Sequence, residues 1–356
     1  MMQPLVSIVI VTWNGRELLR RFLPSVLAQD GPREIILVDN ASTDGTPEFV
    51  RDNFPEVQLI RNARNDGTAE GSNVGARVAH GDLLFFLSND MELEPGVVRR
   101  LSSHFAADPM VGVCTLKMRR ITAEGHRLDL LDSVGGDVDV FGMPHARGIH
   151  ETDHGQWDTP QEVFFSFGGA LMIRRTLFEQ IGGYDAAYFT LADDIDLCWR
   201  VRLLGYRVLV EPAAVLYHRV SATLDTPAFP RSFRRFLSER NTLRTLLKNY
   251  SMLALLWVLP LDLFLVVCES LFFLLCGHVR LACASPRAVA WNIRHIGETL
   301  AERRRIQSMR KAGDDEILRH MLKGSQKLRM LWHYFRVRAG GQKSEWDGYF
   351  GAERRR

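Results

Sequence analysis

The strongest constraint on the fold is a series of short apolar runs, each of which stops at a polar corner. Four such runs are "VSIVIVTWNG" (6–15), "REIILVDNASTDGT" (33–46), "VQLIRN" (57–62) and "DLLFFLSNDMEL" (82–93). Continuous apolar runs of this kind are typical of strands that are buried on both faces of a parallel sheet. Segments with helical spacing separate them, for example "RELLRRFLPSVLAQ" (16–29). The alternation predicts an α/β fold, with a βαβ array around a mostly parallel central sheet.

The chain as a whole divides into three predicted parts. Residues 115–165 are rich in Gly, His and Asp, which predicts strands joined by long loops, and "VFFSFGGALMIRRTLFEQIGGYD" (163–185) restores a strand and a helix. Beyond residue 230 the pattern becomes helical. We therefore predict an α/β domain over residues 1–225, membrane-associated helices over 226–320 and a polar tail over 321–356.

Composition excludes several classes of protein. A chain with 46% hydrophobic and 24% charged residues is not disordered overall. The five cysteines form no C-x-x-C pair, so neither a disulfide framework nor a zinc site is expected, and a reducing compartment is favoured. The start "MMQPLVSIVIVTWNG" lacks the basic residues and the long apolar core of a signal peptide. These features predict that the α/β part works in the cytosol.

The apolar stretch "MLALLWVLPLDLFLVVCESLFFLLC" (252–276) is long enough to cross a bilayer. However, Pro260, Asp262 and Glu269 are unfavourable near a bilayer centre, and a single span normally has a basic bias on its cytosolic side only. Here both flanks are basic, with Arg231, Arg234, Arg235, Arg240, Arg244 and Lys248 before the stretch and Arg280, Arg287 and Arg294 after it.

We therefore expect the stretch either to bend near Pro260 and return, or to lie in the membrane interface. The basic residues of the neighbouring helices are then expected to lie on anionic headgroups. The alternatives are a buried helix of a soluble appendage and a dimer interface. No nucleic acid is expected as a partner, because the arginines lack interleaved stacking aromatics.

Polar side chains occupy the corners that follow the predicted strands. They are Thr12 and Asn14, then Asp39, and then Ser88, Asn89 and Asp90. Ligands bind beyond the carboxyl ends of the strands in open α/β sheets, so these corners predict one ligand site at one edge of the sheet. A plain Asx turn at Asp39 and a structural turn at residues 88–90 are the alternatives.

A further acidic cluster, "LADDIDLCWR" (191–200), places Asp193, Asp194 and Asp196 where an apolar pattern begins. Acids in this position stabilise the N-terminus of a helix, which is the simpler interpretation. The other interpretation is a catalytic base beside its orienting neighbours, one of which has a raised pKa. The cluster alone does not decide between them.

Five motifs together resemble those of glycosyltransferase family 2, and more closely its bacterial rhamnosyltransferase-like branch. In chain order they are "VSIVIVTWNG", "ILVDNASTDGT", "LFFLSND", "FGGALMIRR" and "DDIDLCWRVRLLGYRV", and the resemblance covers residues 5–221. It implies a GT-A fold, the α/β architecture of nucleotide-diphospho-sugar transferases, for the first predicted domain.

The resemblance also implies roles for individual residues. Asp39 would hydrogen-bond a uracil or thymine ring, and Asp194 would be the catalytic base, with Asp193 and Asp196 in support. A divalent cation, Mg²⁺ or Mn²⁺, would be held by Asp90 and His218, although Ser88 replaces the first acid of the family's D-x-D motif. The remaining implied positions are Thr12, Asn14, Asn73, Ser88 and Asn89 near the nucleotide sugar, and Gly168 and Gly169 on the acceptor side. A purely structural role is the alternative for His218 and for the two glycines.

The implied function is an inverting, non-processive glycosyltransferase at the cytoplasmic face of the cell membrane. Single addition is expected because "CWRVR" (198–202) stands where processive members carry Q-x-x-R-W. The implied donor is a UDP- or dTDP-linked sugar, with rhamnose as the candidate, and the implied acceptor is a polyprenyl-linked or other cell-envelope glycan. The alternatives are a catalytically silent sugar-nucleotide-binding membrane subunit and a nucleotidyltransferase, although "TWNGRELL" (12–19) lacks the basic Gly-rich loop that the latter needs.

Overall fold

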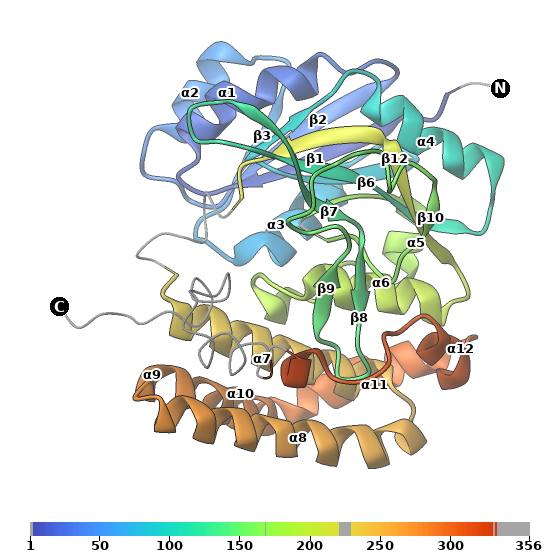
Figure 1. Ribbon diagram of the computed structural model, residues 1–356. Coiled ribbons are helices and arrows are strands. Elements are labelled where there is room, and N and C mark those ends of the chain that lie inside the picture. Colours follow the sequence, from blue (N-terminus) through green and yellow to red (C-terminus); the bar gives the residue numbers. More distant parts are fainter. Residues whose placement is uncertain (1–2, 168, 221–228, 330–331, 333–356) are drawn as a thin grey trace.

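The computed structural model places an α/β layer against a layer made only of helices (Figure 1). The structure describes residues 3–167, 169–220, 229–329 and 332. The α/β layer holds the central sheet and its covering helices, and α7 to α11 form the helical layer at the lower side of Figure 1. The α/β prediction is therefore confirmed.

The central sheet is mixed and mostly parallel. Its strands and those of a small two-stranded sheet are β1 (Val6–Thr12), β2 (Arg33–Asp39), β3 (Gln58–Arg61), β4 (Leu83–Ser88), β5 (Met91–Leu93), β6 (Val111–Ile121), β7 (Arg127–Val134), β8 (Gly136–Val138), β9 (Pro144–Ala146), β10 (Gln161–Glu162), β11 (Ala170–Arg174) and β12 (Arg207–His218). The order is β10-β12-β6-β11-β4-β1-β2-β3, with β5 beside β12 and β7 beside β6. Strands β4, β1, β2 and β3 run parallel, as predicted, whereas β11 is antiparallel to both of its neighbours.

Both faces of the sheet are buried, which explains the uniformly apolar strands. On β1, Ile8 packs into one hydrophobic core and the next residue, Val9, packs into the other, as the alternation of a strand requires. The helices of this layer are α1 (Arg16–Leu27), α2 (Thr46–Asn53), α3 (Gly67–Val78), α4 (Val97–Ala107), α5 (Arg175–Gln180), the short η1 (Ala186–Tyr188) and α6 (Asp193–Leu203). Residues of α1 and α4 share the core of Ile8, and residues of α5 and α6 share the core of Val9.

The helical layer consists of α7 (Arg231–Asn249), α8 (Met252–Leu275), α9 (Val279–Ala282), α10 (Ala284–Arg294) and α11 (Ile296–Met309), followed by α12 (Asp314–Arg319). Helix α8 is continuous through Pro260, so the bend expected there is absent from this helix. Asp262 and Glu269 are buried. Their charges are balanced inside the layer by ion pairs with Lys327 and Arg235, respectively. The expected in-and-out hairpin is therefore wrong, and the two acids point into the protein.

The basic residues of α7 also differ from the expectation. Arg240, Arg244 and Lys248 are buried, with exposed fractions of 8%, 2% and 0%. The charges of Arg244 and Lys248 are balanced within the protein, since these two side chains lie 2.8 and 2.6 Å from the carboxylate of Asp185. Arg240 donates to the carbonyl oxygens of Ala187 and Tyr188 instead. The prediction that these three side chains lie on lipid headgroups is therefore wrong.

Candidate active site

The carboxyl ends of β1, β2 and β4 meet at one edge of the sheet. The parallel register pairs Thr12 with Asp39 and Val11 with Ser88. Thr12 Oγ1 accepts a hydrogen bond of 2.7 Å from Asn89 Nδ2. The structure therefore brings Thr12, Asp39, Ser88 and Asn89 together, because strands of similar length in parallel register must end side by side.

The two carboxylate oxygens of Asp39 have different roles: one accepts a hydrogen bond in a turn, and the other has no hydrogen-bond partner among the described residues. Its Oδ2 accepts a hydrogen bond of 3.1 Å from the backbone N–H of Ser42, which is the turn interaction considered above. Its Oδ1 is buried and has no hydrogen-bond partner among the described residues. Buried polar atoms are nearly always hydrogen-bonded, so this oxygen suits a ligand N–H group that enters at the strand edge.

Asn14 joins the loops that follow β1 and β2. Its backbone has a positive φ of 48°, a conformation that Asn tolerates better than most residues. Its N–H donates to Ser42 Oγ at 2.7 Å, and its Oδ1 accepts from the N–H of Thr43 at 2.8 Å. These contacts hold the loop that carries Asp39.

Asp90, in the turn between β4 and β5, lies close to His218 at the end of β12. His218 ends β12 opposite Met91 of β5, which places its Nε2 3.5 Å from Asp90 Oδ2. On the other side of the ring, Nδ1 lies 2.8 Å from Asp132 Oδ2. Burial alone would lower the pKa of His218, but the carboxylates of Asp90 and Asp132 raise it to about 10.

This pair fits a divalent cation that the protein shares with a ligand. Among the described residues, no group of three or more His, Cys, Asp and Glu side chains could hold a metal alone. Asp90 offers a hard oxygen, and His218 would offer Nε2 once a cation displaces the proton that the raised pKa of the ring keeps there. The carboxylate on its Nδ1 is the support that metal-binding histidines usually have. The diphosphate of a nucleotide sugar would supply further oxygens. Sequence reasoning missed Asp132, whose only signal is an acid between Leu131 and Ser133 in strand β7.

Asp193 and Asp194 begin α6 after a loop with unusual backbone conformations. Phe189, Leu191 and Ala192 all have positive φ values, of 64°, 70° and 61°. Asp194 Oδ1 accepts a hydrogen bond of 2.8 Å from the N–H of Ile195. Burial raises the pKa of Asp193 to about 6, and the charge of Asp196 adds to this effect. Both interpretations of the cluster therefore have support, because the acids lie in the first turn of a helix and one of them has a perturbed pKa.

The start of α3 connects the sheet edge to these acids. Asn40, next to Asp39, donates from Nδ2 to the carbonyl oxygen of Gly67 at 2.9 Å. Thr68 Oγ1 then lies 3.2 Å from the carbonyl oxygen of Phe189 and 3.5 Å from Asp193 Oδ2. The two predicted parts of the site are thus neighbours in the fold.

The remaining predicted residues have mainly structural contacts. Asn73 exchanges two hydrogen bonds of 2.9 Å with the backbone of Tyr184, so its amide holds α3 to the segment before η1. Gly169 has a φ of 78°, and a Cβ there would lie 2.6 Å from Ser88 Oγ, so only glycine fits. Gly168 lies outside the described residues. Asp196 is buried between Arg200 and Lys248, at 2.8 and 3.0 Å, and anchors α6 to α7.

Comparison with known families and relatives agrees with this geometry. Residues 7–182 match the family model described as Glycosyl transferase family 2. The N-acetylglucosaminyl-diphospho-decaprenol L-rhamnosyltransferase of Mycobacterium tuberculosis (strain ATCC 25618 / H37Rv) is 28% identical over 249 residues, which are 64% of this chain and 80% of that protein. The O-antigen biosynthesis protein RfbC of Myxococcus xanthus is 29% identical over 238 residues, which are 64% of this chain and 18% of that protein.

Two solved structures share the fold. A mannosyltransferase from Pyrobaculum calidifontis in complex with GDP-Man and Mn²⁺ has a TM-score of 0.52 at 18% identity, over 87% of this chain and 86% of that one. GalNAc-T7 with UDP, GalNAc and Mn²⁺ has a TM-score of 0.53 at 19% identity. The match covers 68% of this chain and 48% of the GalNAc-T7 chain. These likenesses confirm the predicted GT-A fold.

Proposed function

Because the chain belongs to glycosyltransferase family 2 and is a glycosyltransferase, we propose that it transfers one sugar from a nucleotide-diphospho-sugar to a lipid-linked or cell-envelope glycan, with inversion. The observation that carries this proposal is the buried Oδ1 of Asp39, which has no hydrogen-bond partner in the described part of the chain and lies at the sheet edge beside Thr12. A uracil or thymine N–H would satisfy that oxygen, which favours a UDP- or dTDP-linked donor. Relatives named as a rhamnosyltransferase and an O-antigen biosynthesis protein make dTDP-linked rhamnose the first donor to test.

Asp194 is the base of the proposed mechanism. Its carboxylate accepts the proton of the acceptor hydroxyl as that oxygen forms a bond to the anomeric carbon. The bond from this carbon to the diphosphate oxygen breaks, and its electron pair leaves with the nucleotide diphosphate. A single displacement of this kind inverts the anomeric carbon. Thr12, Asn14, Asn73, Ser88 and Asn89 remain proposed donor-side residues, and Gly168 and Gly169 remain proposed acceptor-side residues.

Asp90 and His218 are the residues that would hold Mg²⁺ or Mn²⁺. The cation would neutralise charge on the leaving diphosphate. The contribution of the chain is to keep His218 oriented through Asp132, and Asp132 is itself held by Arg120 at 3.3 Å. Two solved relatives by fold contain Mn²⁺, which supports a divalent cation here.

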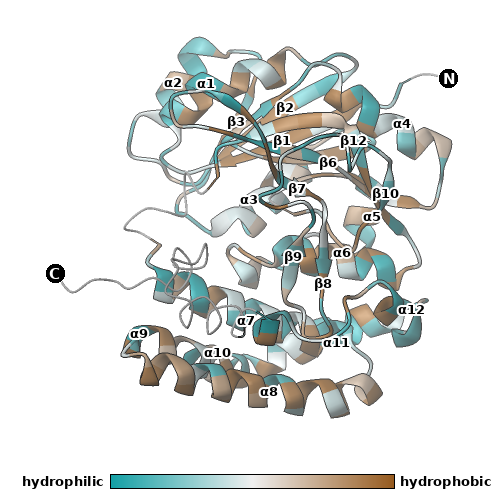
Figure 2. Cartoon of the chain, in the orientation of Figure 1, coloured by the Kyte–Doolittle hydropathy of each residue, from teal (hydrophilic) through white to brown (hydrophobic). Residues whose placement is uncertain are grey.

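The outer face of α8 supports membrane association. This face, which lies away from the protein along the edge of the molecule in Figure 2, is mostly hydrophobic. Its exposed large apolar residues are Met252, Leu253, Leu256, Trp257, Leu261, Phe264, Val267, Leu271, Leu274 and Leu275. Exposed apolar surfaces of this extent mark interaction sites. Since the acids of α8 point inward, the helix is suited to lie in the plane of the interface, with the exposed Arg280, Arg287 and Arg294 near headgroups.

The cytoplasmic face is proposed because all five cysteines are free, as expected in a reducing compartment. The proposed division of the chain into a catalytic domain over residues 1–225, membrane helices over 226–320 and a tail over 321–356 needs one refinement. Helix α7 belongs structurally to both of the first two parts, because its buried charges contact the segment that leads into α6.

The test is a panel of UDP- and dTDP-linked sugars, assayed for donor hydrolysis and for transfer to a short polyprenyl-diphosphate glycan. We expect turnover with one donor class and an inverted linkage in the product. Turnover with none of the donors, or retention of configuration, would contradict the proposal.

A parallel flotation assay with anionic vesicles tests the membrane. Phe264→Glu on α8 should lose vesicle binding, whereas Leu128→Glu, an exposed leucine on β7, should keep it. Equal binding by the two variants would contradict membrane attachment through α8.

A further inference from the structure

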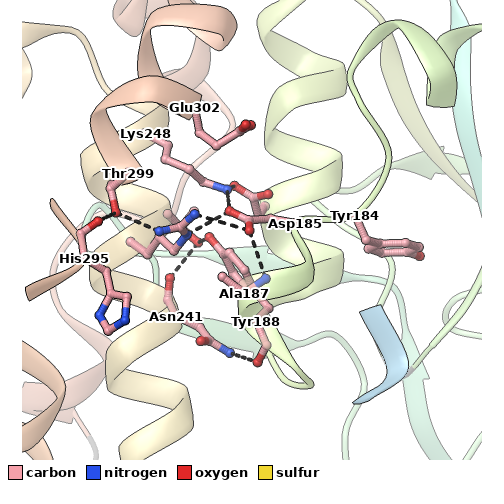
Figure 3. Close-up of polar contacts among 12 residues, drawn as sticks. Tyr184, Asp185, Ala187, Tyr188, Asn241, Lys248, His295, Thr299 and Glu302 are labelled. Carbon is pink, nitrogen blue, oxygen red and sulfur yellow. Dashed lines mark hydrogen bonds and ion pairs between the residues drawn. The ribbon is translucent and has the colours of Figure 1, made fainter. Parts of the chain in front are cut away.

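The helical layer reaches directly into the loop that precedes the proposed base. We call residues 187–192 the base loop. Asn241 of α7 is completely buried, and its Nδ2 contacts three carbonyl oxygens of this loop, of which Figure 3 shows that of Tyr188. The acceptors are Tyr188, Thr190 and Leu191, at 3.0, 2.9 and 2.7 Å. One amide group on α7 therefore fixes the path of most of the loop.

Arg240, the preceding residue on α7, holds the start of the same loop. Its guanidinium donates to the carbonyl oxygens of Ala187 and Tyr188, both at 2.7 Å. The guanidinium also lies 4.7 Å from the ring centroid of Trp291 on α10, which keeps it in place. Arg240 and Asn241, two consecutive residues of α7, thus together contact the carbonyl oxygens of four residues of the base loop.

The conformation of the base loop needs outside support. Phe189, Leu191 and Ala192 are not glycines, yet each has a positive φ. Such conformations persist only where the surrounding structure imposes them. The contacts from Asn241 cover the carbonyls on both sides of Phe189 and the carbonyl of Leu191. We expect that loss of these contacts lets the loop relax and shifts the start of α6.

Buried ion pairs hold both ends of this segment to the same helix. Lys248 of α7 lies 2.6 Å from Asp185, which precedes the loop, and 3.0 Å from Asp196, which follows it. Arg244 pairs with Asp185 and donates to Thr299 of α11 at 2.7 Å (Figure 3). Tyr188 adds a hydrogen bond of 2.6 Å to Thr245. Helix α7 therefore holds the segment from residue 185 to residue 196, which Thr68 of α3 also contacts.

We propose that Asn241 and Arg240 are positioning residues that fix the base loop, so that the helical layer determines where the carboxylate of Asp194 meets the acceptor. The inference rests on the proposed role of Asp194. It assigns a function in the reaction to a helix that the sequence suggested was only a membrane contact. Neither residue touches the substrate in this proposal.

The test compares two buried asparagines of the helical layer. Asn241→Ala removes the loop contacts, whereas Asn292→Ala removes a buried amide on α10 that bonds to Arg240 and Ala288 backbone oxygens instead. We expect the kcat of Asn241→Ala to fall roughly 10- to 100-fold, because small displacements of a reacting group have effects of this size. Nucleotide Kd should stay within about twofold of the native value. Hydrogen exchange should become faster at the amides of residues 189–196.

The control, Asn292→Ala, should lose a similar amount of thermal stability but keep a kcat near that of the native enzyme and normal exchange in the loop. Equal losses of kcat in the two variants, or native kcat in Asn241→Ala, would overturn the inference. If Asn241→Ala does not fold, Arg240→Lys replaces it. This variant keeps the charge and loses the planar donors to Ala187 and Tyr188, and it should show the same separation of kcat from Kd.

Asp194→Asn, assayed in parallel, separates this inference from the proposed function. An inactive Asp194→Asn with a fully active Asn241→Ala would contradict positioning by α7 only. An active Asp194→Asn would instead contradict the assignment of the base on which the inference depends.

Discussion

The donor side and the base side of the site are held by different kinds of contact. At the sheet edge, short side chains such as Thr12 and Asp39 follow parallel strands, and the register of the backbone places them together. At the start of α6, Asp194 follows a loop that is held by side chains of α7, far away in the sequence. The donor side of the site therefore depends on local backbone geometry, and the base side depends on a buried helical layer.

The two sides also differ in how charge is balanced. At the donor edge, the side chains of Asp90 and His218 are 9% and 13% exposed. Next to α6, the side chains of Asp196 and Lys248 are each only 1% exposed, and Lys248 also pairs with Asp185, whose side chain is 10% exposed. The most deeply buried charges are therefore those of Asp196 and Lys248, which suits a fixed support.

The largest expected effect separates the base from a simple helix cap. Asp194→Asn should reduce the transfer rate by about 100-fold or more, because the acceptor proton then lacks its base. Asp315→Asn provides the control, since Asp315 also lies in the first turn of a helix, α12. Steady-state transfer assays should show a loss for Asp194→Asn alone. Normal turnover would leave the helix-cap interpretation as the correct one.

The buried support should matter more for stability than any surface pair. Lys248→Met leaves Asp185 and Asp196 with fewer counter-charges, and breaking a buried pair costs about 3–5 kcal/mol. The exposed pair of Arg20 and Glu17 is the matched case, and Arg20→Met should cost at most about 1 kcal/mol. Urea denaturation of both variants measures the difference. Similar free energies of unfolding for the two variants would show that the buried cluster is not a support.

On the donor side, we expect Asp132→Asn to weaken activation by Mn²⁺ or Mg²⁺ by roughly 10- to 100-fold, as removal of a carboxylate behind a metal-binding histidine usually does. A titration of activity against metal concentration gives this value. The neighbouring surface acid Asp129, whose side chain is 79% exposed, supplies the control variant Asp129→Asn. An unchanged metal requirement in Asp132→Asn would remove His218 from the proposed cation site.

The smallest expected effect concerns pH. Burial raises the pKa of Asp193 to about 6, so its charge is lost as the pH falls through that value. A negative neighbour strengthens Asp194 as a base, and transfer should therefore decline several-fold below about pH 6. Asp193→Asn should remove this inflection. The effect of pH on folding has the opposite sign. The native state binds this proton more tightly than the unfolded chain does, because the pKa of Asp193 is higher in the native state. The contribution of Asp193 to the free energy of unfolding therefore decreases as the pH rises from about 4 to about 6.

Much of the donor side could be predicted from the sequence. The strand pattern and the polar corners at Asp39 and Asn89 are local features, and the parallel register then brings them together. The support of the base could not be predicted in the same way. Arg240, Arg244 and Lys248 have the spacing of a basic helix face, and nothing local reveals that Asp185 and Asp196 neutralise two of them. Asp132 was missed for the same reason, because its partner His218 is distant in the sequence.

The central claim is that the sheet edge binds the nucleotide and α6 acts on the acceptor. Calorimetric titration of UDP and dTDP into the native protein, Asp39→Ala and Asp194→Asn tests it most directly. Loss of a charged hydrogen-bond acceptor should weaken nucleotide binding by Asp39→Ala about 10- to 100-fold, while Asp194→Asn should bind as the native protein does. Native affinity in Asp39→Ala, or a comparable loss in Asp194→Asn, would contradict the account.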